Sequence, residues 1–148
     1  MQIPNLRQKK SLANENSIFS ITASTKANMH FTKLVPSVFY TDIADGLQLF
    51  VDCLQFTIAH KDFTASQPYC VLQKGNISLM LFQDAQLANE HNPELRLVTD
   101  NIEEVYTQVA ASHPHLLHPN LNKVTLRPWG AKEFAIADKQ LGIRFQQW

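Results

Sequence analysis

The sequence has few glycines, few cysteines and no excess of charge of either sign. Only 4 of its 148 residues are glycine, and no glycine-rich loop of the kind that cradles nucleotide phosphates is present. The two cysteines, Cys53 and Cys70, do not form a CxxC or other zinc-binding pattern. Because both lie among apolar residues, we expect free buried thiols and a protein of the reducing cytoplasm.

The charge balance and the lack of long apolar runs argue against two classes of partner. Lys and Arg together number 13, as do Asp and Glu, so the formal net charge is +0. Without a basic excess, nucleic acid is not expected as a partner. No apolar run is long enough to cross a bilayer, so a membrane is not expected either. The hydrophobic fraction of 45% is sufficient for the core of a globular domain.

Residues 1–28 differ in composition from the rest of the chain. They are rich in Ser, Asn, Gln and Thr and carry more Lys and Arg than Asp and Glu. We interpret them as a polar, basic N-terminal extension that is dispensable for folding, followed by a folded domain over 29–148. Within the extension, 17–22 could form a short strand that adds to a sheet edge or to a dimer partner.

From residue 29 onward the same order of elements occurs twice, as strand, helix and three strands. In the first half, apolar spacing predicts a strand over 34–40, a helix from a Thr41-Asp42 cap to about residue 54, and strands over 56–60, 69–73 and 77–83. In the second half it predicts a strand over 94–98, a helix capped by Thr99-Asp100, and strands over 123–127, 133–137 and 143–147. Residues 84–93 are expected to form a polar loop with at most a helical turn. The fold class is therefore α+β, with two βαβββ repeats forming a concave eight-stranded mixed sheet and the helices on its outer face.

Alternation along these strands separates two faces of the sheet. We expect the face under the helices to present an apolar set: Val38, Leu79, Leu81, Leu95, Leu97, Phe134, Ile136, Ile143 and Phe145. The other face mixes large apolar groups with polar and charged ones: Ser37, Phe39, Ser78, Met80, Phe82, Glu94, Arg96, Glu133, Arg144 and Gln146. A face fully exposed to water would not be expected to hold the large apolar groups. A core sealed from water would not be expected to hold the charged groups. The mixture predicts a concave, partly dry pocket.

A Pro/Gly turn carries a tryptophan shortly before the seventh predicted strand. The stretch runs Arg127-Pro128-Trp129-Gly130, and Glu133 follows three residues later. Pro and Gly favour a turn with the indole at its tip. An indole there suits the wall of a ligand pocket, a hinge plug or a packed turn.

These segments together resemble the vicinal oxygen chelate superfamily, which includes glyoxalase I, extradiol dioxygenases, and fosfomycin and bleomycin resistance proteins. The resemblance is carried by Tyr40-Thr41-Asp42-Ile43 through Phe50, by Leu54-Gln55-Phe56, by Val98-Thr99-Asp100 and by residues 127–138. It covers the chain from about residue 29 and is greatest for bleomycin-resistance-like members. It implies a homodimer in which paired or exchanged halves close two pockets. One departure is the turn Asp138-Lys139-Gln140-Leu141-Gly142, which leaves the register of the last strand open by one residue.

The resemblance also implies where metal-dependent members would place their ligands, and this chain departs from that pattern. The corresponding positions fall near Val35, Met80, Glu94 and Arg144. Only Glu94 suits a hard divalent cation, and an arginine would repel one. We therefore expect no metal and no cofactor. We expect an ion pair between Glu94 and Arg144 in place of the metal, joined by Arg96 or Glu133.

Other chemistries have weaker support. His113, His115 and His118 lie close together in a proline-rich stretch, but no carboxylate or cysteine stands near to complete a zinc site. Glu133 and Glu94 are weak candidates for a catalytic base.

Three functions follow as hypotheses. The first is a metal-free small-molecule-binding protein of the glyoxalase/bleomycin resistance type, which acts by sequestration in a pocket at the dimer interface. The second is a metal-dependent lyase, isomerase or dioxygenase of the same superfamily, and the third is a dimeric interaction module with a vestigial pocket. The ligand-binding residues predicted for the first are Phe39, Met80, Phe82, Glu94, Arg96, Trp129, Glu133 and Arg144.

Overall fold

A computed structural model describes residues 26–148 of the chain. The strand predicted over 17–22 lies outside the described residues. Residues Val35–Trp148 form one compact unit, and 26–34 contain no helix or strand. The division of the chain at residue 29 therefore stays a prediction. Within the described part of the chain, no helix is both long and apolar enough to span a membrane.

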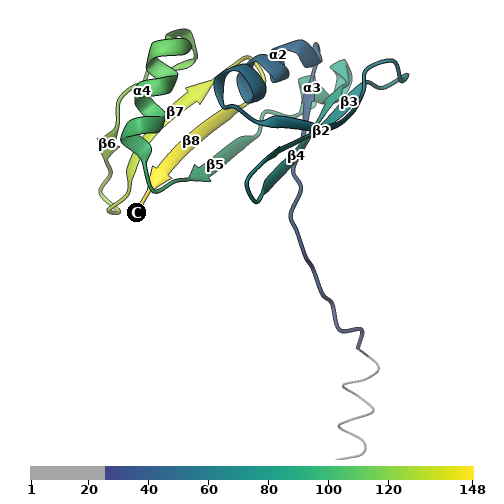
Figure 1. The fold of residues 1–148 in the computed structure, drawn as a ribbon, viewed down its shortest axis with the longest axis horizontal. Coiled ribbons are helices and arrows are strands. Elements are labelled where there is room, and N and C mark those ends of the chain that lie inside the picture. The colour runs from purple at the N-terminus through teal and green to yellow at the C-terminus, as the bar shows by residue number, and fades with distance from the viewer. Residues whose placement is uncertain (1–25) are drawn as a thin grey trace, which may run out of the picture. The chain divides into compact units, whose positions relative to one another are not determined.

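Two repeats of the same element order make up the compact unit (Figure 1). The first repeat consists of β1 (Ser37–Tyr40), α2 (Ile43–Leu47), the π-helix η1 (Gln48–Cys53), β2 (Thr57–Asp62), β3 (Tyr69–Lys74) and β4 (Ile77–Gln83). The second consists of β5 (Glu94–Val98), α4 (Ile102–Ser112), the 3₁₀ turn η2 (Pro114–Leu116), β6 (Thr125–Leu126), β7 (Lys132–Ala137) and β8 (Gly142–Gln147). A short helix, α3 (Ala85–Glu90), lies in the connection that we expected to be mainly a loop.

The two predicted βαβββ repeats and their eight strands are confirmed, with one difference in pairing. The strands form two four-stranded mixed sheets, ordered β1-β4-β3-β2 and β5-β8-β7-β6, in place of a single eight-stranded ladder. Each sheet is thus built from one repeat. The strand predicted over 123–127 is wrong in length, because only Thr125 and Leu126 pair with β7. It stops where Pro128, which has no backbone N–H to donate, opens the next turn.

The helices of the two repeats share a cap from the fourth strand, and α2 has a further cap of its own. Asp42 caps α2 by accepting from the Ala44 N–H at 2.9 Å, as its position predicts. A glutamine at the end of the fourth strand of each repeat adds a second cap. Oε1 of Gln83 accepts from the Ile43 N–H at 3.1 Å, and Oε1 of Gln147 accepts from the Ile102 N–H at 2.9 Å. These side chains satisfy first-turn donors that the helices themselves cannot pair.

Two helix predictions are corrected by the structure. The first helix is α-helical only to Leu47 and continues as the π-helix η1 to Cys53. Leu54 follows as the C-cap, and Gln55 then takes the left-handed conformation (φ 64°). The second helix is capped at Asn101, with no side-chain cap bond, and not at Thr99-Asp100. Thr99 instead donates its hydroxyl to Oδ1 of Asn101 at 2.7 Å.

A single hydrophobic core joins the helices of both repeats to one face of each sheet. Of the nine residues predicted on the helix side, all are buried except Leu95 and Leu97, which are half-buried and pack against the same core. Gly46 of α2 lies against this sheet face, because a Cβ there would stand 2.6 Å from the Tyr40 ring and 2.9 Å from Leu81. Cys53 and Cys70 are free and buried, as predicted.

A hydrogen bond to a buried tyrosine also links the two repeats. The Tyr40 hydroxyl, on β1, donates to Oδ2 of Asp138 at 2.8 Å, in the turn between β7 and β8. Burial raises the pKa of Tyr40 far above its ordinary value, and the Asp138 carboxylate raises it further. The hydroxyl therefore stays protonated and remains a donor.

Candidate functional site

The candidate site lies on the face of the second sheet that points away from α2 and α4, which we call the distal face. Strand register places Glu94 and Arg96 of β5, Arg144 and Gln146 of β8, and Glu133 of β7 on this face, side by side across three strands. This is the register predicted for the last strand, so the uncertainty of one residue is resolved.

A pocket of about 590 Å³ opens over this face. Its floor includes the small residues Ala135 and Ala137 of β7 and Gly142 of β8, which leave room above the sheet. Glu94 and Arg144 line it from the strands, and Arg127 lines it from the turn after β6. The remaining walls come from three loops: Asn92 and Pro93 before β5, His118, Asn120 and Leu121 before β6, and Asp138 to Leu141 between β7 and β8.

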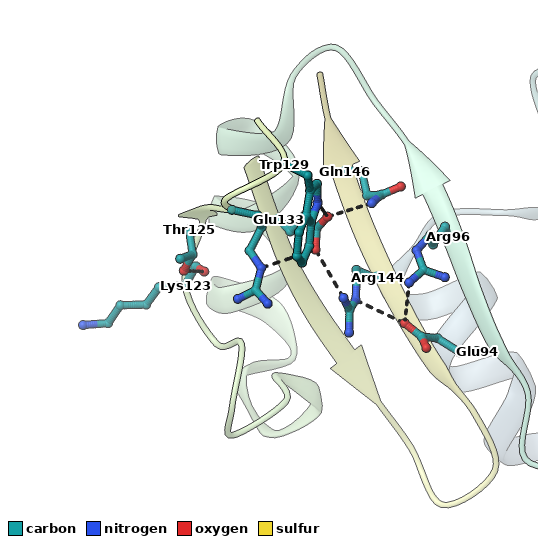
Figure 2. Close-up of polar contacts among 9 residues, drawn as sticks. Glu94, Arg96, Lys123, Thr125, Trp129, Glu133, Arg144 and Gln146 are labelled. Carbon is teal, nitrogen blue, oxygen red and sulfur yellow. Dashed lines mark hydrogen bonds and ion pairs between the residues drawn. The ribbon is translucent and has the colours of Figure 1, made fainter. Parts of the chain in front are cut away.

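The Glu133 side chain is fully buried beside this pocket and holds the surrounding groups in place. Its Oε2 accepts hydrogen bonds from Nε2 of Gln146 at 2.7 Å and from Nε1 of Trp129 at 2.8 Å (Figure 2). Its Oε1 lies 3.4 Å from Nη1 of Arg144 and 3.9 Å from Nε of Arg127. The carboxylate thus has a polar partner on each oxygen, as a buried charge requires.

The same contacts determine the ionisation of Glu133. Burial alone would raise the pKa of its carboxyl, but the hydrogen bonds from Gln146 and Trp129 and the charges of Arg144 and Arg127 outweigh burial and lower it. The side chain is therefore ionised near neutral pH, and three hydrogen bonds and the nearby Arg127 guanidinium engage its two oxygens. Such a carboxylate positions other groups and is a poor base.

Arg144 connects Glu133 to the second carboxylate of the site. Its Nε lies 3.1 Å from Oε1 of Glu94, and Nη2 of Arg96 approaches the same oxygen at 3.7 Å. The predicted Glu94–Arg144 ion pair is therefore present, with both Arg96 and Glu133 in the network (Figure 2). The contact at Nε is an ion pair without hydrogen-bond alignment, since this buried Nε has no hydrogen-bond partner among the described residues.

The tryptophan turn closes one side of the network. The Arg127 N–H donates to the Ala131 carbonyl at 2.8 Å, and Gly130 takes a positive φ of 97° that favours glycine. The guanidinium of Arg127 stacks on the Trp129 ring, 4.8 Å from the ring centroid. Of the alternatives left open for Trp129, the structure shows a half-exposed indole (48%) tied to Glu133 at the rim of the site.

The remaining predicted residues lie on the distal face of the first sheet. Phe39 of β1, Phe82 of β4 and Tyr69 of β3 form a row of rings across three paired strands, with centroids 5.6 Å and 6.2 Å apart. Met80 is half-buried beside this row. Together these four residues form what we call the aromatic face. Among the described residues, no hydrogen bond or ion pair connects it to Glu133, Arg144 or Glu94.

Sequence reasoning thus predicted two groups that the fold keeps on separate sheets, and it missed two members of the polar group. Gln146 was placed on the correct face but not in the site, although its amide donates to Glu133. Arg127 was missed because it lies in a turn, where strand alternation has no meaning. The one signal in the sequence was its position two residues before Trp129, because arginine side chains often stack on aromatic rings.

The residues of this site do not fit a metal ion. Within residues 26–148, no group of three or more His, Cys, Asp or Glu side chains could hold one. Glu94, the single position suited to a divalent cation, faces two guanidinium groups. In the proline-rich stretch, the rings of His113 and His115 lie 5.8 Å apart, but His118 is directed elsewhere, since it lines the pocket and accepts from the Asn120 N–H.

Comparison with known structures identifies the fold. No protein-family model and no curated sequence matches the chain. A bleomycin-binding protein in complex with bleomycin is 22% identical, over 80% of this chain and 99% of that one, with a TM-score of 0.61. A glyoxalase/bleomycin resistance protein/dioxygenase superfamily member from Sphaerobacter thermophilus is 14% identical, over 79% and 98%, with a TM-score of 0.58.

A third structure with the same fold is the fosfomycin resistance protein FosX from Mesorhizobium loti. It is 11% identical, over 80% of this chain and 92% of that one, with a TM-score of 0.56. The chain therefore has the fold that its sequence resemblance to the vicinal oxygen chelate superfamily predicts.

Proposed function

We propose that this protein binds and sequesters a small molecule, without a metal and without catalysing a reaction, in a pocket completed by a second copy of the chain. The observation that carries the proposal is the engagement of Glu133, the only fully buried carboxylate among the described residues. Two hydrogen bonds and two guanidinium groups occupy it. The site thus has a preformed polar network and lacks a free general base.

The fold supports binding as the task of the site. Solved structures with this fold include a bleomycin-binding protein and a fosfomycin resistance protein. A pocket of about 590 Å³ is within the range that small-molecule sites use. Metal-free binding agrees with the guanidinium groups that surround Glu94.

The separation of the two predicted groups supports a shared pocket. Ligand sites combine an apolar lining with a few fixed polar groups. Here the polar network lies on the second sheet and the aromatic face on the first. A twofold dimer that sets the aromatic face of one protomer against the polar network of its partner would build two complete sites. We propose that this homodimer acts in the cytoplasm.

Native mass spectrometry and elemental analysis of protein purified without chelator test this proposal. We expect about one retained small molecule per protomer and no stoichiometric divalent metal. Arg144→Gln should release the molecule, whereas Lys132→Gln should retain it, because Lys132 is exposed and its neighbour Glu133 points to the other face of β7.

Two other results would contradict the proposal in different ways. A stoichiometric Zn, Ni or Mn ion lost in Glu94→Gln would indicate the metal-dependent alternative. A dimer that retains nothing and gains no thermal stability from any small molecule would indicate an interaction module.

A further inference from the structure

We infer that the molecule bound in this pocket carries an anionic oxygen group, a carboxylate or a phosphate, and that Arg127 and Arg144 bind it. The inference rests on the proposed function and adds the charge of the ligand. It starts from the charges that line the pocket. Three are cationic (Arg127, Lys139, Arg144) and two are carboxylates (Glu94, Asp138).

Both of these carboxylates are already engaged by the protein. Oδ2 of Asp138 accepts from the Tyr40 hydroxyl, and its Oδ1 accepts from the backbone N–H groups of Gln140 at 2.7 Å and Leu141 at 2.9 Å. Oε1 of Glu94 faces the guanidinium groups of Arg144 and Arg96. The negative charge of the pocket is therefore largely neutralised from within, and a cationic ligand would meet arginines.

The arginines, in contrast, are not fully hydrogen-bonded by the protein, although Arg144 forms ion pairs with Glu94 and Glu133. Nε of Arg127 and Nε of Arg144 are buried, and neither has a hydrogen-bond acceptor among residues 26–148. A buried N–H without an acceptor is unfavourable. Carboxylate and phosphate oxygens are the acceptors that guanidinium groups bind best, through short charge-assisted hydrogen bonds. The two Nε atoms are themselves enclosed, but 32% of the Arg127 side chain and 27% of the Arg144 side chain are exposed. An oxyanion in the pocket would therefore be bound by the outer N–H groups of the two guanidinium groups.

Glu133 acts in this arrangement as a positioning residue. Its Oε1 lies near both guanidinium groups, at 3.4 Å from Arg144 and 3.9 Å from Arg127. Because its side chain is fully buried, it holds the arginines from beneath and does not meet the ligand. The stacking of Arg127 on Trp129 fixes the second arginine further. Preorganised donors of this kind bind an anion without first losing side-chain freedom.

Matched aromatic probes that differ only in charge test the inference on the full chain. Benzoate, benzamide and benzylammonium are titrated while the Nε–H resonances of the arginines are followed by NMR. We expect benzoate to shift the resonances of Arg127 and Arg144 and to bind at least about tenfold more tightly than benzamide. Phenyl phosphate should act as benzoate does.

Substitutions make the test specific to the two arginines. Arg127→Gln and Arg144→Gln should each weaken benzoate by about tenfold, since each removes charged hydrogen bonds to the anion. Lys132→Gln removes the same charge from the same sheet outside the pocket and should change the affinity by less than about twofold. Arg127 lies on a partly exposed turn, so its variant remains informative if Arg144→Gln fails to fold.

The outcomes separate this inference from the function on which it rests. Equal binding of benzamide or benzylammonium in the pocket would overturn the inference and leave sequestration standing. Binding by none of the probes would also overturn it, whereas sequestration is decided separately by the mass that the purified protein retains.

Discussion

At the scale of the residue, Glu133 organises the candidate site. It contacts Gln146 and Arg144 of β8, and Trp129 and Arg127 of the turn between β6 and β7. Removing its charge would leave the two arginines without their shared counterion, and leaving buried charge unpaired is unfavourable. Both guanidinium groups are partly exposed to solvent, so we expect the cost to be moderate.

We expect Glu133→Gln to lower the free energy of unfolding by about 1–3 kcal/mol at pH 7. Because the folded pKa of this carboxyl lies below its ordinary value of 4.5, its stabilisation is complete above about pH 4.5 and is lost as the pH falls through the folded pKa. The difference between wild type and variant should therefore shrink below pH 4.5. Urea unfolding from pH 3 to 7 measures it.

The matched control for this prediction is Glu103→Gln, on the exposed side of α4. It should change the free energy of unfolding by less than about 0.5 kcal/mol at every pH. A Glu133→Gln variant as stable as wild type at pH 7 would show that the network contributes nothing to the fold.

The two buried thiols allow a second test at this scale. Burial raises the pKa of Cys53 to about 11 and also raises the pKa of Cys70. Since the thiolate is the reactive form, both cysteines should resist alkylation by iodoacetamide at pH 8 in native protein and react once it is unfolded in urea. Mass spectrometry counts the adducts, and rapid labelling of native protein at either position would contradict the burial described here.

The polar half of the site could be predicted at the scale of single residues because strands carry a strict alternation. Once Glu133, Arg144 and Glu94 were placed on one face, their pairing followed from charge. Arg127 could not be placed, since a turn imposes no such alternation. The separation of Phe39 and Phe82 from these charges could not be predicted either, because alternation gives the face of a strand but not the sheet to which it belongs.

At the scale of the element, the position of every strand could be predicted, but some element ends and types could not. The apolar spacing from Ile43 to Leu54 is compatible both with an α-helix and with a helix that widens to a π-helix. The π-helix η1 could therefore not be predicted from the sequence. The polar connection 84–93 contains α3 because Asp84 accepts from the Leu87 N–H at 2.9 Å, a cap that was overlooked.

Gly46 provides a prediction for helix α2. Helix propensity alone says that Gly46→Ala should stabilise the protein by up to about 1 kcal/mol. The new methyl group would stand 2.6 Å from the Tyr40 ring, and overpacking of this kind costs about 1–3 kcal/mol. We expect the clash to dominate, so that the variant loses about 1–2 kcal/mol by urea unfolding.

Ala44→Gly, on the exposed side of the same helix, separates the two effects. It should cost about 0.5–1 kcal/mol through propensity alone. A gain in stability from Gly46→Ala would show that the helix does not approach β1 as closely as described.

At the scale of the whole molecule, the proposed dimer is the main expectation. We expect sedimentation at micromolar concentration to show a dimer, because the aromatic face leaves Phe39 and Phe82 half-exposed in a single chain. Phe82→Asp should shift the protein toward monomer by placing a charge in that interface. Ile77→Asp puts the same charge on an exposed position on the opposite face of β4 and should leave the dimer intact. A wild-type monomer would exclude the shared pocket.

The bulge in β2 has a consequence for behaviour at high concentration. This strand is an edge of the first sheet, and its register with β3 shifts between Ile58 and His60. A flat, regular edge would offer its free N–H and C=O groups to another chain and allow fibrils to grow. Here the bulge interrupts that row, and Lys61 and Asp62 follow it with charge. The corresponding edge of the second sheet is β6, which is two residues long. Strands β2 and β6 thus resist strand addition from solution, which removes two of the four sheet edges as starting points for aggregation at high concentration.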